Sequence, residues 1–68
     1  MYHIIKLDKL VKSINTLPIL REVNIQDIME IRRSISQGVY LCKILAQRSN
    51  NNEDAIKLYY SKMKENYE

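Results

Sequence analysis

Apolar residues recur at helical spacing in three stretches of this 68-residue chain. Steps of three and four place them on one side of residues 6–16, 24–48 and 53–66, with polar residues opposite. Ile is abundant and by itself favours strands, but its spacing here is helical. We therefore predict an all-α protein of three helices over these ranges, in which a long central helix forms a helical hairpin or bundle with the other two.

The first predicted helix has a clear end. Pro18 disfavours helical backbone at Leu17, so a boundary falls near these residues. Residues 1–5 are ambiguous and fit either an extension of the helix or a short extended arm. The apolar stripe of this helix consists of Leu7, Leu10, Val11, Ile14 and Leu17.

The central helix has the strongest start signal. Asn24 is a favourable N-cap, and Asp27 three residues later completes a capping-box pattern. Its apolar seam alternates steps of three and four, as in a short run of heptads. The seam consists of Ile28, Ile31, Ile35, Gly38, Cys42 and Leu45.

Gly38 leaves two interpretations of this helix open. It either lies on the seam and lets another helix approach closely, or ends a first helix as a C-terminal cap. We favour a continuous helix over 24–48, because the seam keeps its phase through Gly38. Because Gly38 then lies within the seam and not between two short helices, no helix-turn-helix is predicted. The Asn50–Asn52 triplet marks the next break, and Glu53 and Asp54 begin the third helix.

The segment from Val39 to Ala46 is apolar on nearly every side. A helix of this kind must be enclosed, by its own fold or by another chain, and so short a chain buries surface poorly. The alternative is that the first and last helices cover it within one molecule. We predict a small non-enzymatic protein–protein interaction module, regulator or assembly factor, which forms a homodimer through the central helix or docks on a larger regulated protein. The predicted contact residues are Val39, Tyr40, Leu41, Ile44, Arg48, Tyr59 and Tyr60.

Length and cysteine content limit the class of protein. The chain is long enough for one domain, residues 1–68. Cys42 is the single cysteine, which excludes an internal disulfide and suits a reducing compartment. Lys6, Asp8 and Lys9 interrupt any secretory signal, and no run is long enough to span a membrane. We expect a cytoplasmic protein, in the host cytoplasm if it is viral.

Residues for catalysis or metal binding are scarce. His3 is the single histidine and lies near the N-terminus, and Cys42 lies on the apolar seam. One His and one Cys cannot supply a metal site, and no base is placed to activate the thiol. The paired acids fit favourable charges at helix starts. We predict no catalytic, cofactor-binding or metal-binding residues and no small-molecule partner.

Nucleic-acid binding is the alternative function. The net charge is +3, and no acid occurs from Ile31 to Asn52, where Arg32, Arg33, Lys43 and Arg48 supply positive charge. On a helix Arg32 and Arg33 point about 100° apart. The four basic residues therefore form no tight patch, and this function ranks second to protein docking.

The spacing Ile28-x-x-Ile31-Arg32-x-x-Ile35-x-x-Gly38-x-Tyr40 resembles a segment of small flagellar anti-sigma factors. The resemblance ends at Tyr40, where those proteins continue with a polar, Asp-containing step and this chain continues with Leu41. It implies an anti-sigma-like regulator as one form of a transcription-regulating protein.

Overall fold

The computed structural model describes residues 7–66, which fold into four helices without strands. They are α1 (Leu7–Asn15), α2 (Ile25–Ile35), α3 (Val39–Gln47) and α4 (Asn52–Asn66). The predicted all-helical class is confirmed. The predicted start of the first helix at residue 6 lies outside the described residues, as does His3. None of the four helices is long and apolar enough to cross a membrane.

The predicted continuous helix over residues 24–48 is wrong. α2 ends at Ile35 and α3 begins at Val39, with a three-residue turn between them. Ser36 closes α2 in the left-handed conformation (φ 55°, ψ 41°), and its N–H donates to the Arg32 carbonyl at 2.8 Å. Gly38 is extended (φ −63°, ψ 158°) and is the N-cap of α3. The chain therefore breaks beside Gly38, but Gly38 does not cap the end of α2.

The seam kept its phase across this break because both helices face the same core. Ile35 at the end of α2 and Cys42 in α3 are both buried. A shared core imposes the same three-and-four spacing on two short helices as one long helix would show. The absence of a helix-turn-helix was predicted from a seam that continues through Gly38. That argument does not hold, because the seam belongs to two separate helices.

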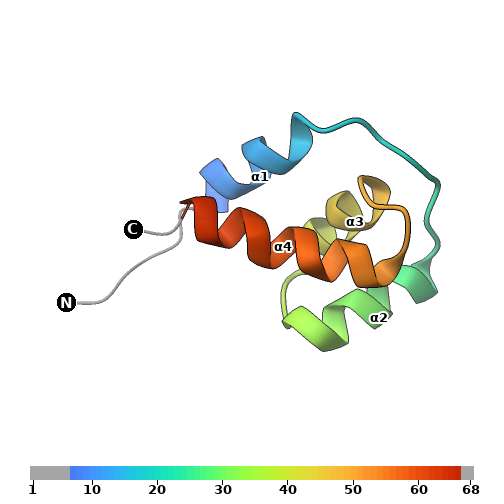
Figure 1. Ribbon diagram of the computed structural model, residues 1–68. Coiled ribbons are helices and arrows are strands. Elements are labelled where there is room, and N and C mark those ends of the chain that lie inside the picture. The colour runs from blue at the N-terminus through green and yellow to red at the C-terminus, as the bar shows by residue number, and fades with distance from the viewer. Residues whose placement is uncertain (1–6, 67–68) are drawn as a thin grey trace.

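The helices form a small bundle around α3 (Figure 1). α2 and α4 start from the same end of the molecule and run side by side, and α1 lies along α4 on the side away from α2. α3 lies behind α4 in this view and contacts all three other helices. Residues 16–24 connect α1 to α2 by passing over the end of α3.

Local capping explains where α2 and α4 begin. The Asn24 side chain accepts a hydrogen bond from the Asp27 N–H at 2.9 Å, and the Asp27 carboxylate accepts one from the Asn24 N–H at 3.3 Å. The predicted capping box is confirmed. At α4, the Asn51 side chain accepts from the Asp54 N–H at 2.8 Å. α4 begins at Asn52, one residue before the predicted start, and ends at Asn66 as predicted.

The core is apolar and takes its largest share from α3. Leu41 and Ile44 expose only 6% and 4% of their surface, because α1, α2 and α4 surround α3. The alternative in which the chain covers its own apolar helix is therefore what the fold adopts. The buried apolar residues are Leu10, Ile14, Ile28, Ile31, Ile35, Leu41, Cys42, Ile44, Leu45, Ala46, Ala55 and Tyr59.

The connection from α1 to α2 is fastened to the C-terminal end of α3. The Leu20 N–H donates to the Gln47 carbonyl at 2.7 Å, and Arg21 Nε donates to the Ala46 carbonyl at 3.0 Å. Carbonyls in the last turn of a helix lack partners within the helix. Leu20 and Arg21 supply such partners, and Arg21 adds a positive charge at the negative end of the helix dipole.

A second set of hydrogen bonds joins the starts of α2 and α4. Asn52 accepts from Arg21 Nη2 at 2.8 Å. Its amide nitrogen donates to Asp27 at 3.2 Å and to Glu30 at 2.7 Å. Asn52 thus ties the connection, α2 and α4 together at one end of the molecule, and the opposite end of α2 leads into the turn and α3.

Candidate functional site

The structure does not bring the seven predicted contact residues together on one surface. Val39, Tyr40 and Tyr60 are exposed, and Arg48 is half-buried. The remaining three, Leu41, Ile44 and Tyr59, belong to the core. In this fold only the first group has side chains available to a partner.

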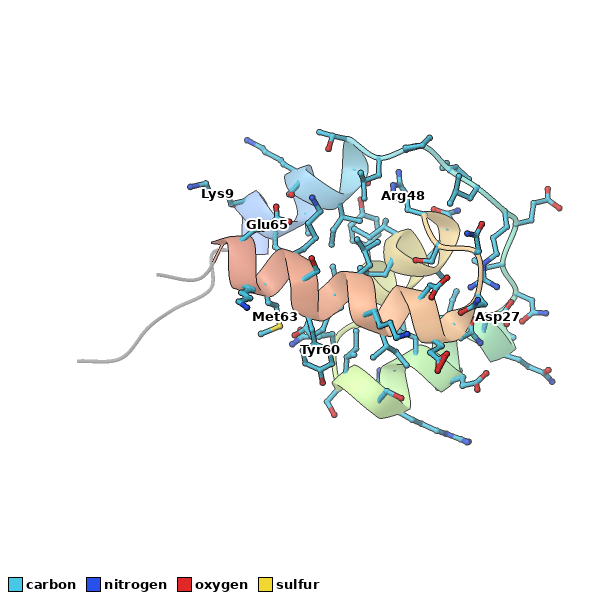
Figure 2. All side chains as sticks on the ribbon, viewed as in Figure 1. Lys9, Asp27, Arg48, Tyr60, Met63 and Glu65 are labelled. Carbon is cyan, nitrogen blue, oxygen red and sulfur yellow. The ribbon has the colours of Figure 1, made fainter. Side chains whose placement is uncertain are left out.

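The Arg48 side chain is engaged within its own helix end. Its Nη1 donates to the Ile44 carbonyl at 3.3 Å and to the Gln47 side chain at 3.2 Å, while its Nε is buried without a hydrogen-bond partner. Figure 2 shows Arg48 beside the connection from α1 to α2. The contacts of Arg48 thus lie at the last turn of α3.

Tyr59 holds the turn between α2 and α3 against α4. Its hydroxyl accepts a hydrogen bond from the Gln37 amide at 2.8 Å. Burial raises the pKa of Tyr59, and the hydrogen bond from Gln37 opposes that shift. The Tyr60 ring packs edge-on against Tyr59, with centroids 5.2 Å apart, and projects from α4 toward α2 (Figure 2). Tyr59 therefore positions the turn, and Tyr60 is exposed beside it.

α3 shows solvent one narrow stripe. Val39, Tyr40 and Lys43 are exposed and Gln47 is half-buried, whereas the other residues of α3 are buried. These four lie at helical spacing, about 100° of the helix circumference. Three of these residues have long side chains with polar ends: the phenol of Tyr40, the ammonium group of Lys43 and the amide of Gln47. We call Tyr40, Lys43 and Gln47 the α3 stripe.

Arg32 of α2 lies close to α3. Burial raises the pKa of the Cys42 thiol, and the positive charge of Arg32 partly offsets that shift. Arg32 itself is exposed and lies in the last turn of α2, just before the turn into α3. The Cys42 thiol is enclosed and contacts the Gln37 carbonyl, with Sγ 3.7 Å from the oxygen. Low exposure and a raised pKa both disfavour a reactive thiolate.

Negative charge gathers at the other end of α2. Acids are absent from residues 31–52, which run from the second half of α2 through the turn, α3 and the following loop to the first residue of α4. Most acids in the described part of the chain lie on the connection before α2, in α2 up to its midpoint or in the first turn of α4, and Figure 2 marks this end with Asp27. They are Glu22, Asp27, Glu30, Glu53 and Asp54. The molecule is therefore electrostatically polarised along α2.

The start of α3 differs from the starts of α2 and α4. Its N-cap, Gly38, has no side chain to accept the free N–H groups, and its first turn carries no acid. A Cβ at Gly38 would meet no atom within 4 Å. The positive end of the α3 dipole is thus open to solvent, next to the exposed Tyr40.

A shallow hollow of about 410 Å³ lies on the outer face of α2. Its lining consists of Ile25, Gln26, Met29, Glu30 and Arg33. All five belong to one helix, so the hollow is a depression between side chains. We call these five residues the α2 outer face. Within residues 7–66, no group of three His, Cys, Asp or Glu residues could hold a metal ion.

The sequence contained a signal for the α3 stripe that was not used. Between Val39 and Gln47, three residues have polar side-chain ends if the cysteine is left aside: Tyr40, Lys43 and Gln47. They are three and four residues apart. Once α3 is known to be enclosed on its other sides, this spacing identifies its solvent-facing edge. The fastening residues Arg21 and Asn52 carry no comparable signal, because their contacts join distant parts of the chain.

Comparison of the chain with protein-family models, with curated proteins and with solved structures finds no match. The functional argument therefore rests on the geometry and chemistry of these surfaces.

Proposed function

We propose that this chain binds double-stranded DNA through α2, the turn and α3, as a small helix-turn-helix protein. One observation carries the proposal: α3 presents an exposed stripe of long polar side chains, free of acids, and follows α2 after a three-residue turn. In a helix-turn-helix the second helix enters the major groove while the first crosses the backbone. Nucleic-acid binding, ranked second from the sequence, thereby becomes the first candidate.

The shape of the stripe favours duplex DNA over RNA. The major groove of B-form DNA, about 12 Å wide, admits a helix, whereas the major groove of an A-form RNA helix is too narrow. Lys43 and Gln47 lie on one edge of α3 and carry groups that hydrogen-bond to base edges. Tyr40 lies at the start of the same edge and adds a hydroxyl group.

Phosphate contacts would come from the end of α2 and the start of α3. Arg32 and Arg33 are exposed there, and helix N-termini with free N–H groups favour phosphate. The acidic first turns of α2 and α4 lie at the other end of α2. This polarity favours an approach in which the turn and α3 meet the DNA first.

Fluorescence anisotropy with a labelled duplex of mixed sequence tests the proposal over a range of salt concentrations. We expect affinity to fall steeply with salt. The double variant Arg32→Ala/Lys43→Ala should reduce the slope of log K against log salt by about 1, through loss of the Arg32 phosphate contact, and should lower affinity further through loss of the Lys43 contact to a base edge. The double variant Lys57→Ala/Lys64→Ala is the matched control, since it removes equal charge from exposed positions of α4.

Two outcomes would contradict DNA binding through this surface. One is the absence of salt-dependent binding at low salt. The other is an equal loss of affinity in both double variants, which would show that only the net charge matters.

Protein docking is the second candidate, favoured by the exposure of Val39, Tyr40 and Tyr60. Large apolar and aromatic side chains of this kind are common at protein interfaces. A regulator of a larger protein, including the anti-sigma-like form, would use them. Tyr60→Ser discriminates, because it should release a co-purifying protein of defined stoichiometry in a native-mass measurement while leaving DNA affinity unchanged.

A further inference from the structure

Val39 is an exposed apolar residue at the start of α3. It leaves 46% of its surface open to solvent, and within the described part of the chain it belongs neither to the buried core nor to the apolar residues packed against it. Its side chain also offers no acceptor to the free N–H groups of the first turn. Packing and capping therefore do not account for a valine at this position.

Lys43 is the neighbour of Val39 on the surface of α3. Residues four apart on a helix have Cβ atoms about 5–6 Å apart, so the two side chains project side by side. Within residues 7–66, the Lys43 ammonium group makes no hydrogen bond or ion pair. No acid occurs from Ile31 to Asn52, so this stretch of the chain leaves the charge of Lys43 unneutralised.

An apolar group beside an ammonium group fits two features of the major groove of DNA. Lysine donates to O6 and N7 of guanine, and an apolar side chain contacts the C5-methyl group of thymine. Successive base pairs lie about 3.4 Å apart along the duplex. Two side chains whose Cβ atoms are about 5–6 Å apart therefore reach base pairs that are adjacent or two steps apart.

We propose that Val39 and Lys43 set the base preference of this chain: Lys43 selects a guanine, and Val39 selects a thymine within about two base pairs of it. The inference rests on the proposed DNA binding and adds to it the bases that are read. In a helix-turn-helix, the N-terminal residues of the second helix contact base edges. Val39 and Lys43 are the first and fifth residues of α3, which agrees with that geometry.

The basic residues at the end of α2 would add affinity without sequence preference. Arg32 and Arg33 are exposed in the last turn of α2. Contacts from this position to phosphates would fix the register of the chain on the duplex but carry no sequence information, because phosphates are alike at every base pair. The choice of sequence therefore depends on side chains of α3 that reach into the groove.

Selection by the full chain from duplexes with a randomised centre of about ten base pairs identifies the preferred site. Fluorescence anisotropy then measures affinity after each thymine in turn is replaced by uracil, which removes one methyl group, and after each G·C pair in turn is replaced by A·T. We expect one thymine-to-uracil change to weaken binding about fourfold. Replacement of one nearby G·C pair should weaken binding at least about fivefold.

The two matching variants should each lose one preference. In Val39→Ser, the uracil duplex should bind as well as the thymine duplex while the guanine preference is retained. In Lys43→Ala, the guanine preference should disappear while the effect of uracil is retained. A general loss of structure or of charge would not separate the two effects. Lys57→Ala removes the same charge from an exposed position of α4 and should keep both preferences.

Circular dichroism of each variant checks that the helices are retained. The inference is overturned if no thymine-to-uracil change in the selected site weakens binding by the parent chain, or if Val39→Ser and Lys43→Ala keep both preferences. Salt-dependent binding without any sequence preference would overturn it and leave the proposed DNA binding intact. Absence of salt-dependent binding would overturn both proposals.

Discussion

In the turn between α2 and α3, the serine and not the glycine adopts the left-handed backbone conformation. The left-handed conformation, which disfavours side chains, is adopted by Ser36, whereas Gly38 has a backbone conformation open to other residues. A glycine near a predicted helix end usually marks the left-handed residue. In this chain Gly38 lies in the turn, but the left-handed residue is Ser36, two positions earlier. Sequence reasoning could thus locate the possible break but not its geometry.

Exchanging the residue types at these two positions should stabilise the protein. Ser36→Gly removes the cost of a side chain in the left-handed region, about 1 kcal/mol. Gly38→Ser should add about 1 kcal/mol, because serine is a favourable N-cap for α3 and restricts the unfolded chain, and a Cβ there meets no atom within 4 Å. Urea denaturation measures both. A loss of stability in Gly38→Ser would mean that the turn needs a conformation other than the one described.

The Arg21 side chain joins the connection before α2 to the end of α3 and the start of α4. Arg21→Ala removes hydrogen bonds to the Ala46 carbonyl and to Asn52. We expect a loss of about 1–2 kcal/mol in the free energy of unfolding, less than for a fully buried charged group because Arg21 is partly exposed. Arg33→Ala is the matched control, because Arg33 is exposed, and should change stability by less than about 0.5 kcal/mol.

At the scale of helices, the sequence predicted the helix ends that depend on neighbouring capping residues. It did not predict the break between α2 and α3, which depends on packing in the core. Asn24 with Asp27, and the asparagines before α4, act within a few residues of themselves. The break at Ser36 depends on α3 turning back into a core that α1 and α4 help to build. The apolar pattern required α3 to be enclosed, but it could not identify what encloses it, so Leu41 and Ile44 were assigned to a partner.

The cap of α2 offers a direct test of local control. Asn24→Ala removes the acceptor for the Asp27 N–H and breaks the capping box. We expect a loss of about 1 kcal/mol in unfolding free energy. Asn50→Ala changes an exposed asparagine in the loop before α4 and should have little effect. Equal losses in the two variants would show that the cap does not stabilise α2 specifically.

At the scale of the whole molecule, one enclosed helix accounts for both stability and the arrangement of surfaces. α3 is covered by three helices and leaves only its stripe to solvent. That enclosure also buries Cys42 and Tyr59, the two described groups whose pKa values rise through burial. The candidate site could be found only in part from sequence, because exposure of Tyr40, Lys43 and Gln47 follows from the enclosure of their neighbours.

Burial of these two groups should make the fold sensitive to alkali. A thiol or phenol whose pKa is raised in the folded state loses its proton more readily in the unfolded chain. Their contribution to stability is therefore intact below the ordinary pKa of cysteine, 9.0, and is lost as pH rises through that value and then through 10.0 for tyrosine. Each group can steepen the decline by at most about 1.4 kcal/mol per pH unit.

Cys42→Ala isolates the thiol's share of this decline. The variant should lose about 1 kcal/mol at pH 7 through the small cavity it leaves. Between pH 8.5 and pH 10, however, its unfolding free energy in urea should fall less steeply than that of the parent, because no thiolate forms in the unfolded chain. Identical slopes for the two proteins would show that Cys42 ionises as readily in the folded chain as in the unfolded one, and hence that α3 is less enclosed in solution than its packing implies.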